Sequence, residues 1–333
     1  GDGLCATSCS DSRFVALWAT GEAGVVQAPR GHVPTAPAPF DNGGPHVLSF
    51  GPGNILAALS GPTLQIWQTS PDGRSCDLKY DLTAALSESL GKGDLASELA
   101  TCLRFQHEQS QFASLLAVCC GESIAVIDYV RGASCGALRA HVDQQCESFC
   151  DCAFAQPSKS VSLVAISEER CIAFDVASKT VMSSITLTTV PLRCMAISAA
   201  VGLVLVGDAA GNLHKVKFET SEAGGLTREK KHCMTANAGD GSNSVSSMLA
   251  ISVLEDPNQA LLAFPDRILC VNLFSGAILL DKRLSQTISC ISTSDGLYFV
   301  AAACFSPLAT VARLELASTL PRHCSRHPET ENQ

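Results

Sequence analysis

Residues 47–73, VLSFGPGNILAALSGPTLQIWQTSPDG, decide the fold. Short apolar runs in this stretch are separated by Gly-Pro-Gly-Asn and Ser-Gly-Pro and followed by Pro-Asp-Gly, combinations that are typical of tight turns. Apolar runs of this length bounded by turn residues predict β-strands, and such short connections predict antiparallel pairing of consecutive strands. A fourth strand near residues 76–80 would complete a four-stranded meander.

The same order of strands and turns recurs along the chain. Seven units can be delimited, at approximately 4–32, 47–80, 97–141, 146–187, 191–232, 244–284 and 287–316. Their third strands end at Trp18, Trp67, Ile127, Phe174, Val216, Val271 and Leu314. Successive ends lie 42 to 60 residues apart, which indicates a repeat architecture with insertions.

Several short motifs in these units resemble those of the WD40-repeat family. They are Leu17-Trp18 after Ser10-Asp11, Ile66-Trp67 after Ser60-Gly61, Ile127-Asp128, Phe174-Asp175, Gly31-His32 and Ala140-His141. The resemblance implies an all-β fold, a seven-bladed WD40-like β-propeller of four-stranded antiparallel blades. It further implies structural repeat roles for Trp18, His32, Trp67, Asp128, His141 and Asp175. Residues 1–320 would then form a single propeller domain, followed by a flexible tail at 321–333.

Closure of the ring is the open point of this prediction. The first and last units contain sequence for three strands each, which gives 26 strands where seven complete blades need 28. An incompletely closed propeller, whose free edge accepts a strand from a partner, is therefore an alternative.

Composition restricts the functions that the chain can have. It has 333 residues, of which 17% are charged, and a net charge of −9. An acidic chain does not fit a protein whose whole surface binds nucleic acid, since phosphate neutralisation needs clustered Lys and Arg. The apolar fraction of 46% is enough for a sizeable core and excludes a wholly disordered chain.

The 17 cysteines indicate a reducing compartment. Many of them lie inside apolar, strand-like runs, where Cys behaves as a small buried hydrophobe, and their odd number leaves at least one unpaired. We therefore expect a cytoplasmic or nuclear protein. No signal peptide is expected at the start of the sequence, and no apolar run reaches the length of a transmembrane helix.

Two clusters of Cys and His are candidate metal ligands. Cys146, Cys150 and Cys152, with His141 upstream, approach the spacing of a zinc site, and Cys324 lies between His323 and His327. Because Cys150 and Cys152 would face the core between sheets, buried thiols are the preferred interpretation. The sequence also offers no nucleophile elbow, phosphate-binding loop or defensible carboxylate pair. We therefore predict no metal, no cofactor and no enzymatic activity.

The surface is then the candidate functional feature. In a propeller, the turns between second and third strands crowd one rim. Eight charged residues are predicted to lie there and to contact a partner: Asp11, Glu122, Glu168, Glu169, Arg170, Asp208, Asp266 and Arg267. Their excess of acid predicts protein partners with a basic contact surface.

These observations predict a non-enzymatic protein–protein interaction scaffold, a subunit of a larger intracellular assembly without membrane insertion. One alternative is a non-catalytic subunit of a nucleic-acid-modifying complex, which would need Arg228, Lys230 and Lys231 to join a basic stripe. Another is a propeller enzyme with its site in the axial channel, which would need polar residues to converge on the axis.

Overall fold

The computed structural model describes seventeen separate parts of the chain. They are residues 3–8, 14–20, 31–34, 47–70, 75–91, 100–106, 114–142, 145–155, 161–198, 201–218, 226–228, 234–235, 246–254, 256–284, 288–294, 297–302 and 311–314. Side chains are described only within residues 47–284.

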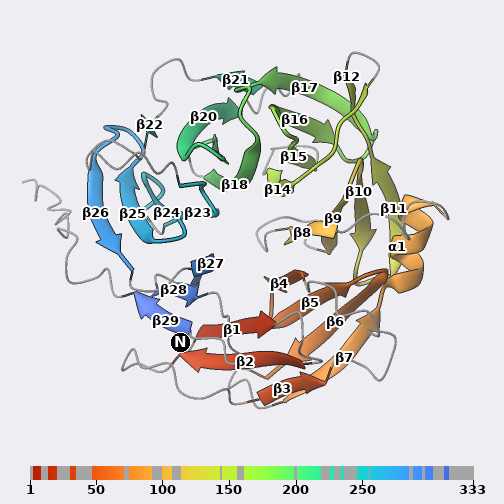
Figure 1. Cartoon of the computed structure of the whole chain (residues 1–333). Coiled ribbons are helices and arrows are strands. Elements are labelled where there is room, and N and C mark those ends of the chain that lie inside the picture. Colours follow the sequence, from red (N-terminus) through yellow and green to blue (C-terminus); the bar gives the residue numbers. More distant parts are fainter. Residues whose placement is uncertain are drawn as a thin grey trace, which may run out of the picture.

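Antiparallel sheets follow one another in chain order around a ring (Figure 1). Five of them are blades of at least four strands, which we name A to E. Blade A comprises β4 (Val47–Gly51), β5 (Ile55–Ser60), β6 (Thr63–Thr69) and β7 (Cys76–Asp81). Blade B comprises β8 (Ala100–Phe105), β9 (Leu115–Cys120), β10 (Ser123–Asp128) and β11 (Ala133–Leu138). Blade C comprises β14 (Asp151–Ala155), β15 (Ser162–Ile166), β16 (Arg170–Asp175) and β17 (Thr180–Thr186).

Blades D and E complete this set. Blade D comprises β18 (Leu192–Ser198), β19 (Leu203–Asp208), β20 (Asn212–Phe218) and β21 (Leu226–Arg228), and the short β22 (Met234–Thr235) also pairs with β20. Blade E comprises β23 (Ala250–Val253), β24 (Gln259–Ala263), β25 (Arg267–Asn272) and β26 (Ile278–Arg283). In each blade the first strand lies nearest to the centre of the ring (Figure 1).

The prediction of seven four-stranded blades is wrong, because the described structure shows five. Within the described residues, the sheets at the two ends of the chain have three strands each. These are β1 (Gly3–Ser8), β2 (Phe14–Thr20) and β3 (Gly31–Pro34), and β27 (Ile288–Ser294), β28 (Leu297–Ala302) and β29 (Val311–Leu314).

The hydrophobic core is distributed between consecutive blades. The second strands β5 and β19 are buried at every position, as expected of strands covered by a neighbouring sheet on both faces. Separate apolar clusters join blade A to B, B to C, C to D and D to E. The outer strands β7 and β26 are largely exposed. Each blade is therefore stabilised mainly by burial against its neighbours.

A repeated backbone contact ties each of three turns to the next blade. The carbonyl oxygen of Gly121, in the turn between the second and third strands of blade B, accepts from the amide of Phe149 at 2.7 Å. The carbonyl oxygen of Glu168 in blade C accepts from Leu192 at 2.7 Å, and that of Asp208 in blade D accepts from Met248 at 3.3 Å. We call these contacts the turn-to-blade hydrogen bonds.

Two small elements lie in the connections on either side of blade B. Helix α1 (Thr83–Leu90) follows blade A and buries its apolar face against blades A and B. The hairpin of β12 (His141–Val142) and β13 (Gln145–Cys146) follows blade B. Within the part of the chain that the structure describes, no helix combines the length and the hydropathy that crossing a membrane requires.

Candidate functional site

A cavity of about 530 Å³ lies at the centre of the ring. The first strands of all five blades contribute to its lining, so we call it the axial cavity. Its charged and hydroxyl-bearing lining residues are Thr101, Arg104, Asp151, Arg193 and Ser252. Polar residues thus converge on the axis, as an axial site requires.

Local irregularities of the first strands place several of these residues. In β8 the pairing shifts between Ala100 and Cys102, and in β18 it shifts between Leu192 and Cys194. Thr101 and Arg193 are therefore the extra residues of two β-bulges, which commonly redirect a side chain next to a functional site. In blade C, Asp151 holds the corresponding place, directly before Cys152.

Asp151 is the most densely bonded group of the cavity wall. Its Oδ1 accepts from Arg104 Nη2 at 3.0 Å and from the Cys102 thiol at 2.9 Å, and its Oδ2 accepts from the backbone N–H of Met195 at 3.0 Å. Burial raises the pKa of the Asp151 carboxyl to about 8, although the charge of Arg104 opposes this shift. Asp151 therefore links blades B, C and D at the axis.

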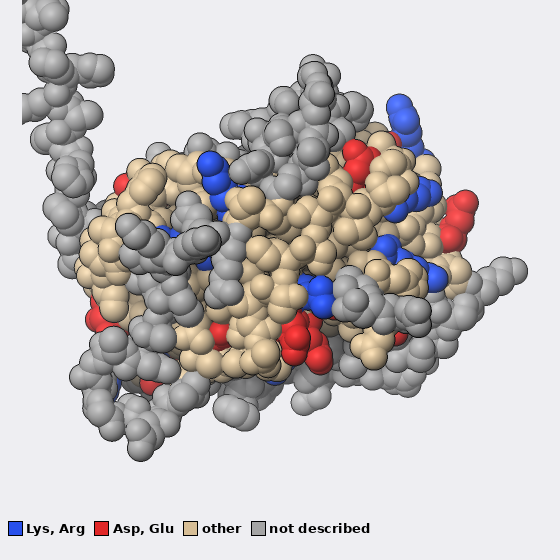
Figure 2. All heavy atoms as spheres, turned by 90° about the horizontal axis from the view of Figure 1, so that it is seen from above, with Lys and Arg blue, Asp and Glu red and all other residues tan. Residues whose placement is uncertain are grey.

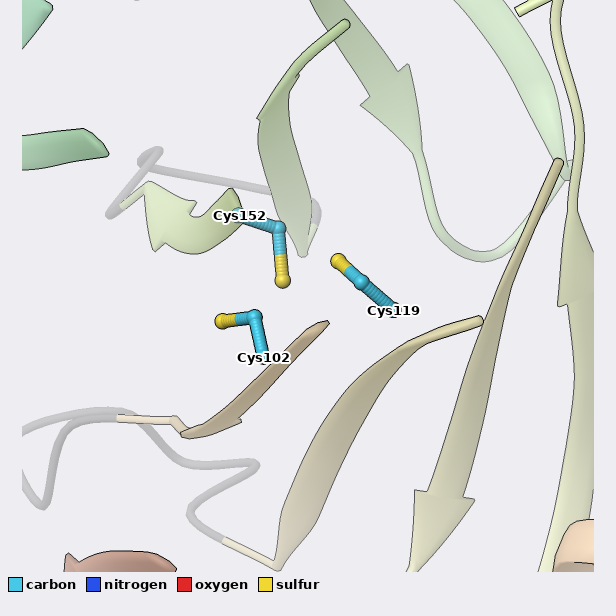
Figure 3. Close-up of side chains that lie close together, drawn as sticks. All are labelled: Cys102, Cys119 and Cys152. Atoms are coloured by element: carbon cyan, nitrogen blue, oxygen red, sulfur yellow. The ribbon is translucent and has the colours of Figure 1, made fainter. Parts of the chain in front are cut away.

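Three cysteine thiols meet beside Asp151. Cys102 on β8, Cys119 on β9 and Cys152 on β14 have sulfur atoms that all lie within 4.8 Å of one another (Figure 3). Cys102 and Cys119 are cross-strand partners in blade B, and Cys152 reaches them from blade C. We call these three residues the thiol cluster. All three are buried, and all are free cysteines.

The thiol cluster is electrostatically asymmetric. Hydrogen bonds from Cys119 and Cys152 lower the pKa of the Cys102 thiol well below its usual value. The same contacts with Cys102, together with burial, raise the pKa of Cys119 and of Cys152. Cys102 is therefore the thiol of this cluster from which a proton is most easily removed.

The cysteines predicted as a possible metal set are not brought together. Cys146 lies on β13, and the Cys150 thiol points to the carbonyl oxygens of Ile166 and Leu192. Of that set only Cys152 joins a cluster, and it does so with Cys102 and Cys119. The second proposed group, around Cys324, lies outside the described residues.

Four of the predicted rim residues expose a carboxylate. Glu122, Glu168, Glu169 and Asp266 are exposed on the turns between second and third strands of blades B, C and E. The amides of Leu192 and Leu187 donate to the carbonyl oxygens of Glu168 and Glu169, and that of Leu284 donates to Asp266. The turns that carry these acids are thus fixed to the connections between blades.

The other predicted rim residues are placed differently. Asp208 is completely buried, so its carboxylate is not on the rim surface, and this prediction is corrected. Its oxygens accept from the backbone amides of Ala210 and Asn212, from Asn212 Nδ2 and from His214 Nε2, all within 2.9 Å. Arg170 pairs with Glu147 at 3.4 Å, and Arg267 lies over the ring of Phe264. Asp11 lies outside the described residues.

Two of the six residues assigned to the structural repeat, Asp128 and Asp175, lie at the ends of third strands. Asp128 accepts from the amides of Val130 and Arg131, and Asp175 accepts from the amide of Ser178, so both close the turn to the outer strand. Asn272, which the sequence analysis did not single out, does the same in blade E.

Of the remaining four repeat residues, Trp67 is buried and His141 is exposed on β12. Trp18 and His32 lie on β2 and β3, for which the structure describes only the backbone.

Comparisons with known proteins support a fold for the chain but no family and no function. No family model matches the chain, and no curated protein matches its sequence. Among solved structures, the crystal structure of Saccharomyces cerevisiae Sqt1 is similar, with a TM-score of 0.58 and 14% sequence identity. The similarity covers 90% of this chain and 77% of the Sqt1 chain. Together with the ring of antiparallel blades, this similarity supports a WD40-type β-propeller fold for the chain.

Proposed function

We propose that the chain is a non-catalytic interaction subunit that docks a basic surface of another protein on its rim. The observation that carries the proposal is the set of four exposed acids on turns that are fixed to the connections between blades. We call Glu122, Glu168, Glu169 and Asp266 the acidic rim. A propeller supports such a role because repetition of blades presents many loops on one rigid face.

The basic residues of the same turns do not balance these acids. Arg170 is engaged by Glu147, and Arg267 by the ring of Phe264. The four carboxylates are exposed, although that of Glu122 also accepts a hydrogen bond from the Cys146 thiol, whereas the two neighbouring guanidinium groups are held by the protein itself. Charge complementarity then favours a partner that presents Lys or Arg, and it contributes to the rate and the specificity of association.

A nucleic-acid partner is less well supported. Figure 2 views the ring from its edge, where Lys and Arg lie scattered among acidic and uncharged residues, and no continuous blue stripe crosses the described surface of this face. Lys230 and Lys231 lie outside the described residues, and only the backbone of Arg228 is described. The acidic rim itself would repel phosphate groups.

Charge reversal on the rim tests the proposal. The tagged full chain, a Glu168→Lys/Glu169→Lys variant and an Asp77→Lys/Asp281→Lys control would each be purified from the protein's own cells at low salt. The control changes the same number of exposed acids, but on the outer strands β7 and β26.

We expect the parent and the control to retain a stoichiometric protein partner that the rim variant loses. Raising the salt concentration should also release it, since exposed charges are screened. An equal yield of partner from the rim variant, or recovery of the parent chain alone, would contradict the proposal.

A second candidate function is the binding of a small anionic molecule in the axial cavity. The convergence of Arg104 and Arg193 on this cavity favours it. A thermal-shift screen with phosphate and carboxylate compounds tests this candidate. Compounds that stabilise the parent should not stabilise Arg193→Gln, because the bulged side chain of Arg193 would supply the positive charge. Equal stabilisation of both proteins would exclude Arg193 from the site.

A further inference from the structure

We propose that the thiol cluster binds a thiophilic metal ion between blades B and C. Cys102, Cys119 and Cys152 would be its ligands, and Asp151 and Arg104 would support them from the side of the axial cavity. This inference is independent of the acidic rim.

The separation of the sulfur atoms fits a single ion. With a Zn–S bond of about 2.3 Å, two thiolates on one tetrahedral zinc lie about 3.8 Å apart, and on any geometry at most about 4.6 Å. The three sulfur atoms already lie within 4.8 Å of one another. In Figure 3 the side chains of Cys119 and Cys152 point toward each other, and the sulfur of Cys102 lies beside that of Cys152. Small rotations of the side chains would therefore bring them to bonding distance.

The chemistry of the ligand set selects the class of ion. Thiolates favour Zn²⁺ and Cu(I) over ions that prefer oxygen ligands. Binding of one ion by three thiols forms three metal–sulfur bonds and releases three protons, because the thiolate is the binding form. With Zn²⁺ the three thiolates leave a single negative charge on the site. The guanidinium of Arg104, bonded to the adjacent Asp151, lies on the side where it can offset that charge.

The environment supplies outer-shell support and a route of entry. Asp151 accepts from Arg104 and from the backbone of Met195, so it holds the guanidinium of Arg104 beside the cluster. The hydrogen bond from the Cys102 thiol to Asp151 is given up when that thiol binds the ion as a thiolate, and the positive charge of Arg104 then offsets the charge of the site. Cys102 and Asp151 both line the axial cavity, so an ion can reach the cluster from there.

The other buried cysteines of the chain provide a matched control. Cys171 on β16 is as fully buried as Cys119, and burial alone raises the pKa of its thiol, to about 12. Among the described residues, only Cys102, Cys119 and Cys152 form such a group of potential metal ligands. The substitutions Cys119→Ala and Cys171→Ala thus remove the same atom from two equally buried strand positions, of which only one belongs to the cluster.

The test is metal binding by the full chain. Parent, Cys119→Ala and Cys171→Ala proteins would be purified under reducing conditions, stripped of metal and incubated separately with Zn²⁺ and with Cu(I). Native mass spectrometry would count bound ions, and circular dichroism would verify folding. We expect one equivalent of one of the two ions in the parent and in Cys171→Ala, and none in Cys119→Ala. The arm that gives this result identifies the ion.

Equal occupancy of parent and Cys119→Ala would overturn the proposal, and so would a parent mass lower by two hydrogens, which indicates a disulfide instead. If Cys119→Ala does not fold, the result for the parent protein tests the proposal alone. The proposal is then overturned if the parent binds less than one equivalent of Zn²⁺ and also less than one equivalent of Cu(I).

Discussion

Replacement of Asp208 by Ala should destabilise the protein far more than replacement of the comparable acid in the neighbouring blade. The Asp208 carboxylate accepts four hydrogen bonds from Ala210, Asn212 and His214, and its own side chain is inaccessible to solvent. In Asp208→Ala these four donors lose their acceptor. The cost of an unpaired buried donor is about 1–3 kcal/mol, and the lower value applies because Ala210 and Asn212 are half-buried and water can reach them.

The expected loss of unfolding free energy is therefore about 4 kcal/mol. An unfolding entropy of about 2.1 cal/mol/K per residue gives roughly 0.7 kcal/mol/K for the whole chain, so Tm should fall by about 6 °C. Asp208→Asn keeps one acceptor oxygen and should lose about half as much.

Urea unfolding followed by circular dichroism, together with calorimetry, would measure these losses. Glu168→Ala is the matched control, because Glu168 is exposed on the equivalent turn of blade C, where a surface substitution is expected to change stability by about 0.5 kcal/mol or less. The reasoning would be refuted if Asp208→Ala and Glu168→Ala were equally stable.

Three further perturbations follow from packing and burial. Gly211→Ala should lower the free energy of unfolding by about 1–3 kcal/mol in urea unfolding, because a Cβ would lie 2.8 Å from the Ser246 carbonyl oxygen. Gly61→Ala is the control: Gly61 also has a positive φ but has open space around it, so the loss of unfolding free energy should be smaller. Phe174→Ala removes a fully buried ring between blades B and C and should cost about 3–5 kcal/mol by the same measurement. The pKa of Asp151, about 8 in the folded protein and about 3.9 when unfolded, means that the folded state holds this proton more tightly. The contribution of Asp151 to the free energy of unfolding should thus be greatest below about pH 4 and be lost as pH rises to about 8. The difference between the parent and Asp151→Asn, titrated in parallel, measures this contribution.

The blade pattern was accessible from the sequence because it is local. Each of the turns around Asn54 and Gly61 is specified by a few consecutive residues. Asn54 and Gly61 both adopt a positive φ in the structure. The number of four-stranded blades was wrong because the first and last units, whose sequence itself indicates only three strands each, were counted as blades of the same kind. Strand pairing depends on contacts that a repeat count does not contain.

Parts of the candidate site could not be read from local pattern. Asp208 and Glu168 both occupy acidic turns, and only the partners Asn212 and His214 make the first of them a buried hydrogen-bond acceptor. The thiol cluster depends on the register between two strands of blade B and on the packing of blade C against them. One sequence signal pointed to the cluster, because Cys102 and Cys152 occupy equivalent positions, each before the apolar part of a first strand. Only the fold shows that these two positions lie next to each other in space.

The turn-to-blade hydrogen bonds make three amides into reporters of the joints of the ring. The amides of Phe149, Leu192 and Met248 are each bonded to the preceding blade, so their hydrogens can exchange with solvent only when two blades separate locally. A ligand or partner that wedges one joint open would accelerate exchange at one of these amides and leave the other two protected. Hydrogen exchange measured at these three amides would therefore show which pair of neighbouring blades separates.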